Sequence, residues 1–112
     1  MDIDKYKKFK EGKKEKSIRQ EKYVAKRYGG RTTIASGATP ADKADVRIDK
    51  VRVECKRTNG KQIAVKKEYL EKLERECLAH EIPVLNIQIE DSNWYLVRPS
   101  EFDYIMQKIK EE

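Results

Sequence analysis

Residues 44–57 read ADVRIDKVRVECKR, two short runs of alternating apolar and charged residues separated by Asp49-Lys50. Alternation with a period of two is typical of half-buried β-strands. The stretch therefore predicts strands over residues 43–48 and 51–57 that form a hairpin turning at Asp49-Lys50.

The hairpin register follows from the same alternation. One face would hold three apolar pairs, Ile48 with Val51, Val46 with Val53 and Ala44 with Cys55. The other face would pair Arg47 with Arg52 and Asp45 with Glu54, with Lys56 two residues further along. A slip of one residue would place apolar and charged side chains on both faces, so this register is strongly favoured.

The register brings two carboxylates together. Residues directly opposite in an antiparallel pair have Cβ atoms ~5 Å apart, which would place Asp45 beside Glu54. Paired carboxylates suit a hard divalent cation such as Mg²⁺, with the Cys55 carbonyl as a further candidate ligand. Such a cation activates water for attack on phosphate, and Lys56 could stabilise the developing negative charge. The alternative is that Lys56 simply bridges two surface carboxylates.

A helical pattern covers residues 17–28 and stops at Gly29-Gly30. Its apolar stripe, formed by Ile18, Ala25 and Tyr28, contains Glu21. Because an unpaired buried charge is costly, Glu21 either pairs with a nearby cation or points into a site.

The remaining pattern completes a mixed sheet flanked by helices. We expect a β-prone segment at 31–34, a small-residue loop at 35–40, and strands near 63–65, at 84–89 and at 94–97. A helix is expected over 66–80 with Tyr69, Leu70, Leu73 and Cys77 on its apolar side. A last helix begins at Pro99-Ser100, with Ser100 and Asp103 as a capping box and a buried stripe of Phe102, Ile105, Met106 and Ile109.

Composition indicates a small, strongly charged domain. The 112 residues carry a formal net charge of +6, which favours a polyanionic partner such as nucleic acid. Residues 1–16 form a basic arm, including Lys13 and Lys14, that is either a solvated tail or a phosphate-binding segment. The single domain would then span residues 17–112. The two cysteines lack metal-ligand spacing and are expected to be reduced thiols. Because no apolar run approaches a membrane span and the N-terminus is charged, we expect a soluble, cytoplasmic protein without a membrane partner.

Asp45 followed by Glu54-Cys55-Lys56 resembles the Asp…Glu-x-Lys signature of the PD-(D/E)XK nucleases. Within that superfamily the chain is most similar to the archaeal-type and phage Holliday-junction resolvases. The similarity covers residues 17–89 as ordered elements: the helix with Glu21, the loop with Ser36, the two strands, and the helix that follows Lys66.

The resemblance implies a restriction-endonuclease-like fold, a mixed central β-sheet flanked by helices. It implies that Asp45 and Glu54 bind the metal, that Glu21 contributes through the metal shell, and that Lys56 is the catalytic lysine. Ser36 would lie near the scissile phosphate and Lys66 would hold DNA. Outside the resemblance, Arg31 and Arg57 could touch phosphates beside the site.

The leading hypothesis is a Mg²⁺-dependent endonuclease specific for branched DNA, with Mn²⁺ able to substitute. The resolvases that the chain resembles act as homodimers that cut two strands of a four-way junction symmetrically. One alternative is a nickase or restriction-type nuclease on duplex DNA. Another is a non-catalytic nucleic-acid-binding module.

Overall fold

The computed structural model describes residues 3–32 and 45–112, with the side chains of 15–32 and 46–112. In chain order the elements are α1 (Ile3–Tyr28), β1 (Arg31–Thr32), β2 (Asp45–Ile48), β3 (Val51–Thr58), α2 (Lys67–Glu76), β4 (Ile82–Ile89), β5 (Ser92–Leu96) and α3 (Pro99–Lys110). The predicted mixed sheet flanked by helices is confirmed.

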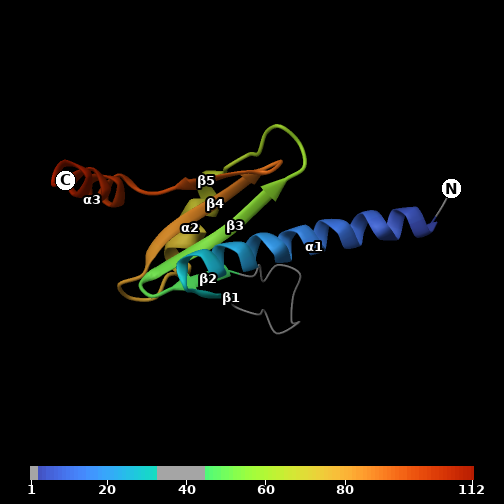
Figure 1. The fold of residues 1–112 in the computed structure, drawn as a ribbon, viewed down its shortest axis with the longest axis horizontal. Helices are drawn as coiled ribbons and strands as arrows, with labels where there is room; N and C mark the ends of the chain where they lie inside the picture. The colour runs from blue at the N-terminus through green and yellow to red at the C-terminus, as the bar shows by residue number, and fades with distance from the viewer. Residues whose placement is uncertain (1–2, 33–44) are drawn as a thin grey trace.

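The five strands form one sheet in the order β1-β2-β3-β4-β5. Strands β3 and β4 are parallel, whereas the other neighbours are antiparallel. A parallel pair requires a crossover connection, and α2 provides it. Helix α1 lies across one face of the sheet and α2 lies behind the other (Figure 1).

The predicted hairpin register is confirmed. Asp45 pairs with Glu54, Val46 with Val53, Arg47 with Arg52 and Ile48 with Val51. Val46 and Val53 are buried and form a core cluster with Val24 and Ala25 of α1. The apolar face of the hairpin therefore packs under α1.

The face of α1 that packs on the sheet differs from the predicted stripe. Ile18 and Tyr28 are exposed, whereas Gln20, Val24 and Ala25 are buried. The stripe prediction was therefore wrong except at Ala25. The direction in which a helix crosses a sheet decides which side of the helix is buried. The periodicity of the helix sequence gives no information about that direction.

The opposite face of the sheet packs against α2, as the apolar side predicted for that helix requires. Leu73 is buried, and with Leu70 it lines a small cleft shared with Pro83, Leu85 and Leu96. Cys77 follows α2 on the same side and is half-buried, and this burial raises the pKa of its thiol. Both cysteines are thiols, as expected.

Several elements differ from the prediction in their extent, and one predicted strand is absent. Helix α1 begins at Ile3, so most of the basic arm continues the helix rather than preceding it. Residues 63–65 form no strand because both neighbours of β3 are already occupied, by β2 and β4. Helix α2 ends at Glu76, four residues earlier than expected.

The last helix begins at Pro99, as predicted, but its capping and packing differ from the prediction. Its N-cap is Arg98, with Pro99 in the first turn, and the Ser100 hydroxyl donates to Glu101 rather than capping with Asp103. No residue of α3 is buried, so the expected buried stripe is exposed.

Within residues 3–32 and 45–112, no helix is long and apolar enough to cross a membrane.

Gly30 has no space for a side chain. A Cβ atom at this position would lie 2.7 Å from the Arg47 carbonyl oxygen and would clash with Ile48. We expect Gly30→Ala to lower the free energy of unfolding by about 1–3 kcal/mol, the usual range for overpacking. Gly60→Ala is the control, because its nearest contact, Thr58 Oγ1, would be 3.5 Å away. Equal urea-denaturation midpoints for the two variants would contradict this packing.

Candidate active site

Glu54 is a buried carboxylate at the centre of the sheet. The residue is only 8% exposed. It pairs with Asp45 on the antiparallel neighbour β2 and with Leu85 on the parallel neighbour β4. Leu85 lines the cleft beneath α2, so Glu54 lies on that same face. Burial of a carboxylate is costly unless cations or donors surround it. This location therefore suits a group that holds a positive charge.

Lys56 lies two residues beyond Glu54 on the same face of β3. Its ammonium nitrogen is 4.0 Å from the centroid of the Tyr69 ring on α2. Lys66 Nζ lies 5.9 Å from the same ring. Tyr69 thus holds Lys56 by a cation–π contact and brings the predicted DNA-binding Lys66 close to the predicted catalytic lysine. The sequence reading assigned Tyr69 only to the apolar side of α2.

A buried amide pair joins α1 to the same strand. Gln20 Nε2 donates to the Lys56 carbonyl oxygen at 3.0 Å and to Asn86 Oδ1 at 2.7 Å. Asn86 Nδ2 in turn donates to the Trp94 carbonyl oxygen at 3.3 Å. Gln20 is 3% exposed and Asn86 is fully buried. Because each amide satisfies its partner, the pair sets the position of α1 over the Lys56 backbone.

The sequence reading missed both amides. A signal existed at Asn86, which interrupts the otherwise apolar strand 84–87 and therefore needs a buried hydrogen-bonding partner. The sequence around Gln20 gives less indication of burial, because only the direction of α1 across the sheet places this side chain in the core.

The remaining predicted metal ligands are described in part. Glu21 follows Gln20 on α1 and is half-buried. Cys55 lies between Glu54 and Lys56, with its side chain against the core beneath α1. The side chain of Asp45 and all of Ser36 lie outside the described residues, as do the side chains of Lys13 and Lys14.

The donor chemistry fits a hard divalent cation, because buried or half-buried carboxylates are the ligands that Mg²⁺ and Mn²⁺ prefer. Among the residues that the structure describes, no three His, Cys, Asp or Glu side chains form a metal-sized group. Asp45 is not included in that set. The grouping of Glu54, Asp45 and Glu21 around a metal therefore stays a prediction.

The predicted phosphate-contacting arginines do not gather at Glu54. Arg57 lies on the α1 side of β3, where it donates to Gln88 Oε1 at 3.3 Å and to Asn59 Oδ1 at 2.7 Å. Arg31 is exposed on β1, opposite Arg47.

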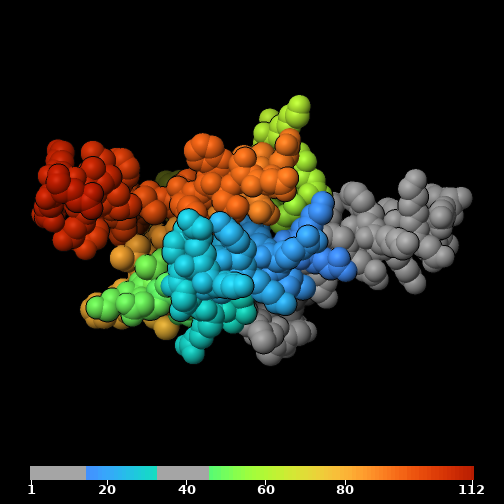
Figure 2. Space-filling model, in the orientation of Figure 1, coloured from blue at the N-terminus to red at the C-terminus, as the bar shows by residue number. Residues whose placement is uncertain are grey.

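Arg57 instead lines a basic groove between α1 and the β4–β5 end of the sheet. The groove encloses about 710 Å³ and also contains the acidic residues Glu90 and Asp91. Its cationic and aromatic members are Lys16, Arg19, Lys22, Tyr23, Lys26 and Arg57. Helix α1, which supplies most of them, crosses the near face of the molecule (Figure 2).

The groove cations differ in their ion pairing from several of the other basic residues. Six cations elsewhere lie within 4 Å of a carboxylate: Arg47, Arg52, Lys67, Lys72, Arg98 and Lys108. No ion pair among the described residues includes a cation of the groove. Lys50, Lys61, Lys66 and Arg75 likewise form no ion pair among the described residues, but they are scattered. Helix α1 gathers Lys16, Arg19, Lys22 and Lys26 in one groove, where they would attract a phosphate backbone.

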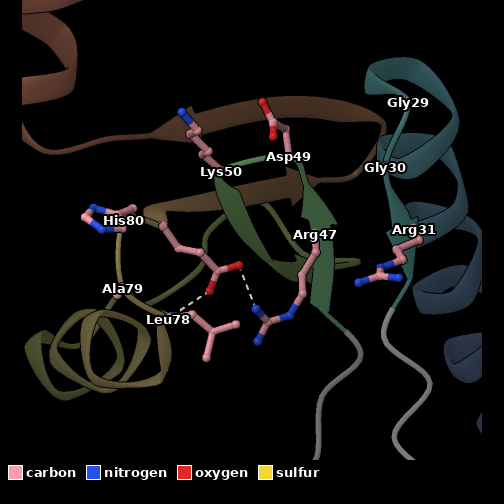
Figure 3. Close-up of a pocket in the computed structure, with 10 residues that line it drawn as sticks. Gly29, Gly30, Arg31, Arg47, Asp49, Lys50, Leu78, Ala79 and His80 are labelled. Atoms are coloured by element: carbon pink, nitrogen blue, oxygen red, sulfur yellow. Dashed lines mark hydrogen bonds and ion pairs between the residues drawn. The ribbon is translucent and has the colours of Figure 1, made fainter.

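A second hollow of about 500 Å³ lies at the turn end of the hairpin, beside Gly29 and Gly30 (Figure 3). There Arg47 contacts Glu81 at 2.6 Å, and the other carboxylate oxygen of Glu81 accepts from the Leu78 backbone N–H at 2.6 Å. Glu81 thus connects the loop after α2 to β2 through these two contacts. His80 is exposed in this loop. The two central charges of this hollow, Arg47 and Glu81, are therefore already paired with each other.

Comparison with protein-family models, curated proteins and solved structures finds no match to this chain. The assignment of the site therefore depends on the geometry of these residues and on the resemblance of their pattern.

The amide pair can be tested by Gln20→Leu, which leaves two buried acceptors without their donor. We expect the free energy of unfolding to fall by about 1–3 kcal/mol, the usual penalty for unsatisfied buried polar groups. Adding Asn86→Leu should cost less than the sum of the single changes, because the partners are coupled. Gln62→Leu in an exposed loop is the control. Additive effects in chemical denaturation would show that the two amides act independently.

Proposed function

We propose that this protein is a metal-dependent DNA endonuclease whose active site contains Asp45, Glu54 and Lys56. The observation that carries the proposal is Glu54, a buried carboxylate in register with Asp45 and two residues from a lysine fixed by Tyr69. A surface ion-pair network would leave Glu54 exposed. The order of the elements supports a restriction-endonuclease-like fold of the PD-(D/E)XK type.

The chemistry would be hydrolysis of a phosphodiester. A divalent cation, Mg²⁺ or Mn²⁺, would be held by Asp45 and Glu54, with Glu21 and the Cys55 carbonyl as further oxygen donors, and would supply Lewis-acid activation. Lys56 would donate a hydrogen bond to the phosphate oxygen on which negative charge accumulates. Tyr69 keeps the ammonium in place, so little reorganisation is needed when the substrate binds.

The basic groove supports nucleic acid as the substrate. Its cations would neutralise phosphates on the α1 side, while Lys66 would contact the backbone beside Lys56. We propose branched DNA, in particular a four-way junction, on the resemblance to the junction resolvases. Cleavage of duplex DNA is the alternative that keeps the same site.

The catalytic assignment can be tested with a labelled four-way junction and its matching linear duplex, each with EDTA or Mg²⁺. We expect Mg²⁺-dependent paired nicks in the junction only. Asp45→Asn, Glu54→Gln and Lys56→Met should each slow cleavage by at least about a hundredfold, as loss of charge-stabilising groups does elsewhere. Asp49→Asn is a matched control in the same hairpin, since asparagine tolerates the left-handed conformation found there.

Equal cutting of both substrates would retain the nuclease and reject the junction. A junction that shifts on a gel but is never cut, with any metal, would favour a binding module. Full activity of Asp45→Asn would refute the assignment of this site.

The groove can be tested separately with Lys22→Gln/Lys26→Gln. We expect weaker DNA binding and a log–log salt slope smaller by about 2, because two phosphate contacts and their released counterions are lost. Lys67→Gln/Lys72→Gln removes the same charge from α2, where Glu71 and Glu76 pair with both lysines. Fluorescence anisotropy across a salt series measures the slope, and identical slopes for the two double variants would exclude the groove.

A further inference from the structure

Three exposed tyrosines follow the basic groove along α1 and β5. Tyr23 lines the groove itself, Tyr28 is the last residue of α1, and Tyr95 lies two residues after the groove residue Asn93 on the same face of β5. Their exposed fractions are 46%, 45% and 40%. Helix α1 and the β4–β5 segment adjoin on the near face of the molecule (Figure 2). We call these three residues the tyrosine cluster.

Two rings of the tyrosine cluster are held by contacts with their neighbours. The ring centroids of Tyr28 and Tyr95 are 6.0 Å apart and the ring planes meet at 87°, which is the edge-to-face arrangement that aromatic pairs prefer. The Tyr95 hydroxyl donates a hydrogen bond to the Tyr28 oxygen, and this bond lowers the pKa of Tyr28. The guanidinium carbon of Arg27 lies 5.8 Å from the Tyr28 ring centroid. Both rings are therefore fixed in position, although much of each remains open to solvent.

The cations beside the tyrosine cluster form no ion pair among the described residues. The groove holds five of them, and Arg27 adds another next to Tyr28. Arg57 is positioned by hydrogen bonds to two neutral amide side chains, so its charge is kept. The two acids of the groove, Glu90 and Asp91, lie in the turn between β4 and β5. This surface therefore combines exposed aromatic rings with an excess of positive charge.

Aromatic rings beside unpaired cations are the groups that bind unpaired nucleic-acid bases. The cations contact the phosphates, and the rings stack on bases because every base has a π-face. In a duplex the bases are already stacked on one another, so exposed tyrosines would contribute little to its binding. From Lys16 to Tyr28 the helix rises about 18 Å, which is long enough to follow several nucleotides of a single strand.

We propose that the basic groove and the tyrosine cluster together bind an unpaired segment of nucleic acid, with its phosphates along α1 and its bases stacked on the three tyrosines. Glu54 and Lys56 lie on the opposite, α2 side of the sheet. A segment bound in the groove is therefore distinct from one that would be cut. The inference goes beyond the proposed cleavage reaction and does not rest on it.

An oligonucleotide without bases separates stacking from charge. The probes are labelled oligo-dT, oligo-rU and an abasic strand, each of about ten nucleotides and with the same number of phosphates. Fluorescence anisotropy of the whole protein in EDTA measures each Kd without metal-dependent cleavage. We expect oligo-dT or oligo-rU to bind at least about tenfold more tightly than the abasic strand, since one base–aromatic stack contributes that much. The tighter of the two identifies the segment as DNA or RNA.

Substitution of the rings tests their role directly. Tyr23→Leu and Tyr95→Leu should each weaken binding of the preferred oligonucleotide about tenfold and leave binding of the abasic strand and of a hairpin duplex unchanged. Tyr23→Phe keeps the ring and should bind as the unmodified protein does. Tyr104→Leu is the matched control, because Tyr104 is 62% exposed and has Lys108 Nζ 5.4 Å from its ring centroid but lies on α3. Urea-denaturation midpoints show whether each variant is folded.

The charge variant Lys22→Gln/Lys26→Gln provides the opposite pattern. It removes two phosphate contacts and no ring, so we expect it to weaken binding of the oligonucleotide and of the abasic strand by the same factor. A larger effect on the oligonucleotide alone would place bases, rather than phosphates, against α1 and would contradict the proposed orientation.

Two further results would overturn the inference. Equal affinity of the unmodified protein for the abasic strand and for both oligonucleotides would show that the groove recognises phosphates alone. Tyrosine-to-leucine variants that retain full affinity, or that weaken duplex binding equally, would show that the rings do not stack on unpaired bases. These measurements contain no divalent metal, so they remain interpretable if the cleavage assays of the proposed active site fail.

Discussion

The two-residue alternation of the β2–β3 hairpin is the constraint on which the structure depends. It places Val46 and Val53 beneath α1, where they form the core, and it places Glu54 and Lys56 on the face covered by α2. A register shifted by one residue would bury charges under α1 and expose the valines. The packing energy that stabilises the fold therefore also brings the candidate catalytic residues together.

Polar groups buried on both faces of the sheet make this arrangement specific. On the α1 side, Gln20 and Asn86 satisfy one another and hold the helix above the Lys56 carbonyl. On the α2 side, Tyr69 contacts the Lys56 ammonium. Lys56 is thus fixed through its backbone by one helix and through its side chain by the other. Removing either amide would leave a buried polar atom unsatisfied, which favours one position of α1 over nearby alternatives.

The charge distribution assigns different roles to the surfaces. Cations of the sheet, α2 and α3 mostly neutralise carboxylates within the chain and so add little to its external field. The cations of α1 have no such compensation among the described residues, and this helix is the natural contact for a polyanion.

The sequence by itself determined the hairpin register, the pairing of Asp45 with Glu54 and the apolar side of α2. These depend on local periodicity, and a strand or helix with one buried face repeats that periodicity in its residues. Only the tertiary structure decided that Gln20 is buried and that the stripe of α3 is uncovered. Each of these depends on how one element crosses or leaves another, and periodicity within an element contains no information about its neighbour. The apolar stripe of α3 shows the difference most clearly, because its pattern predicts burial without specifying whether its own chain covers it.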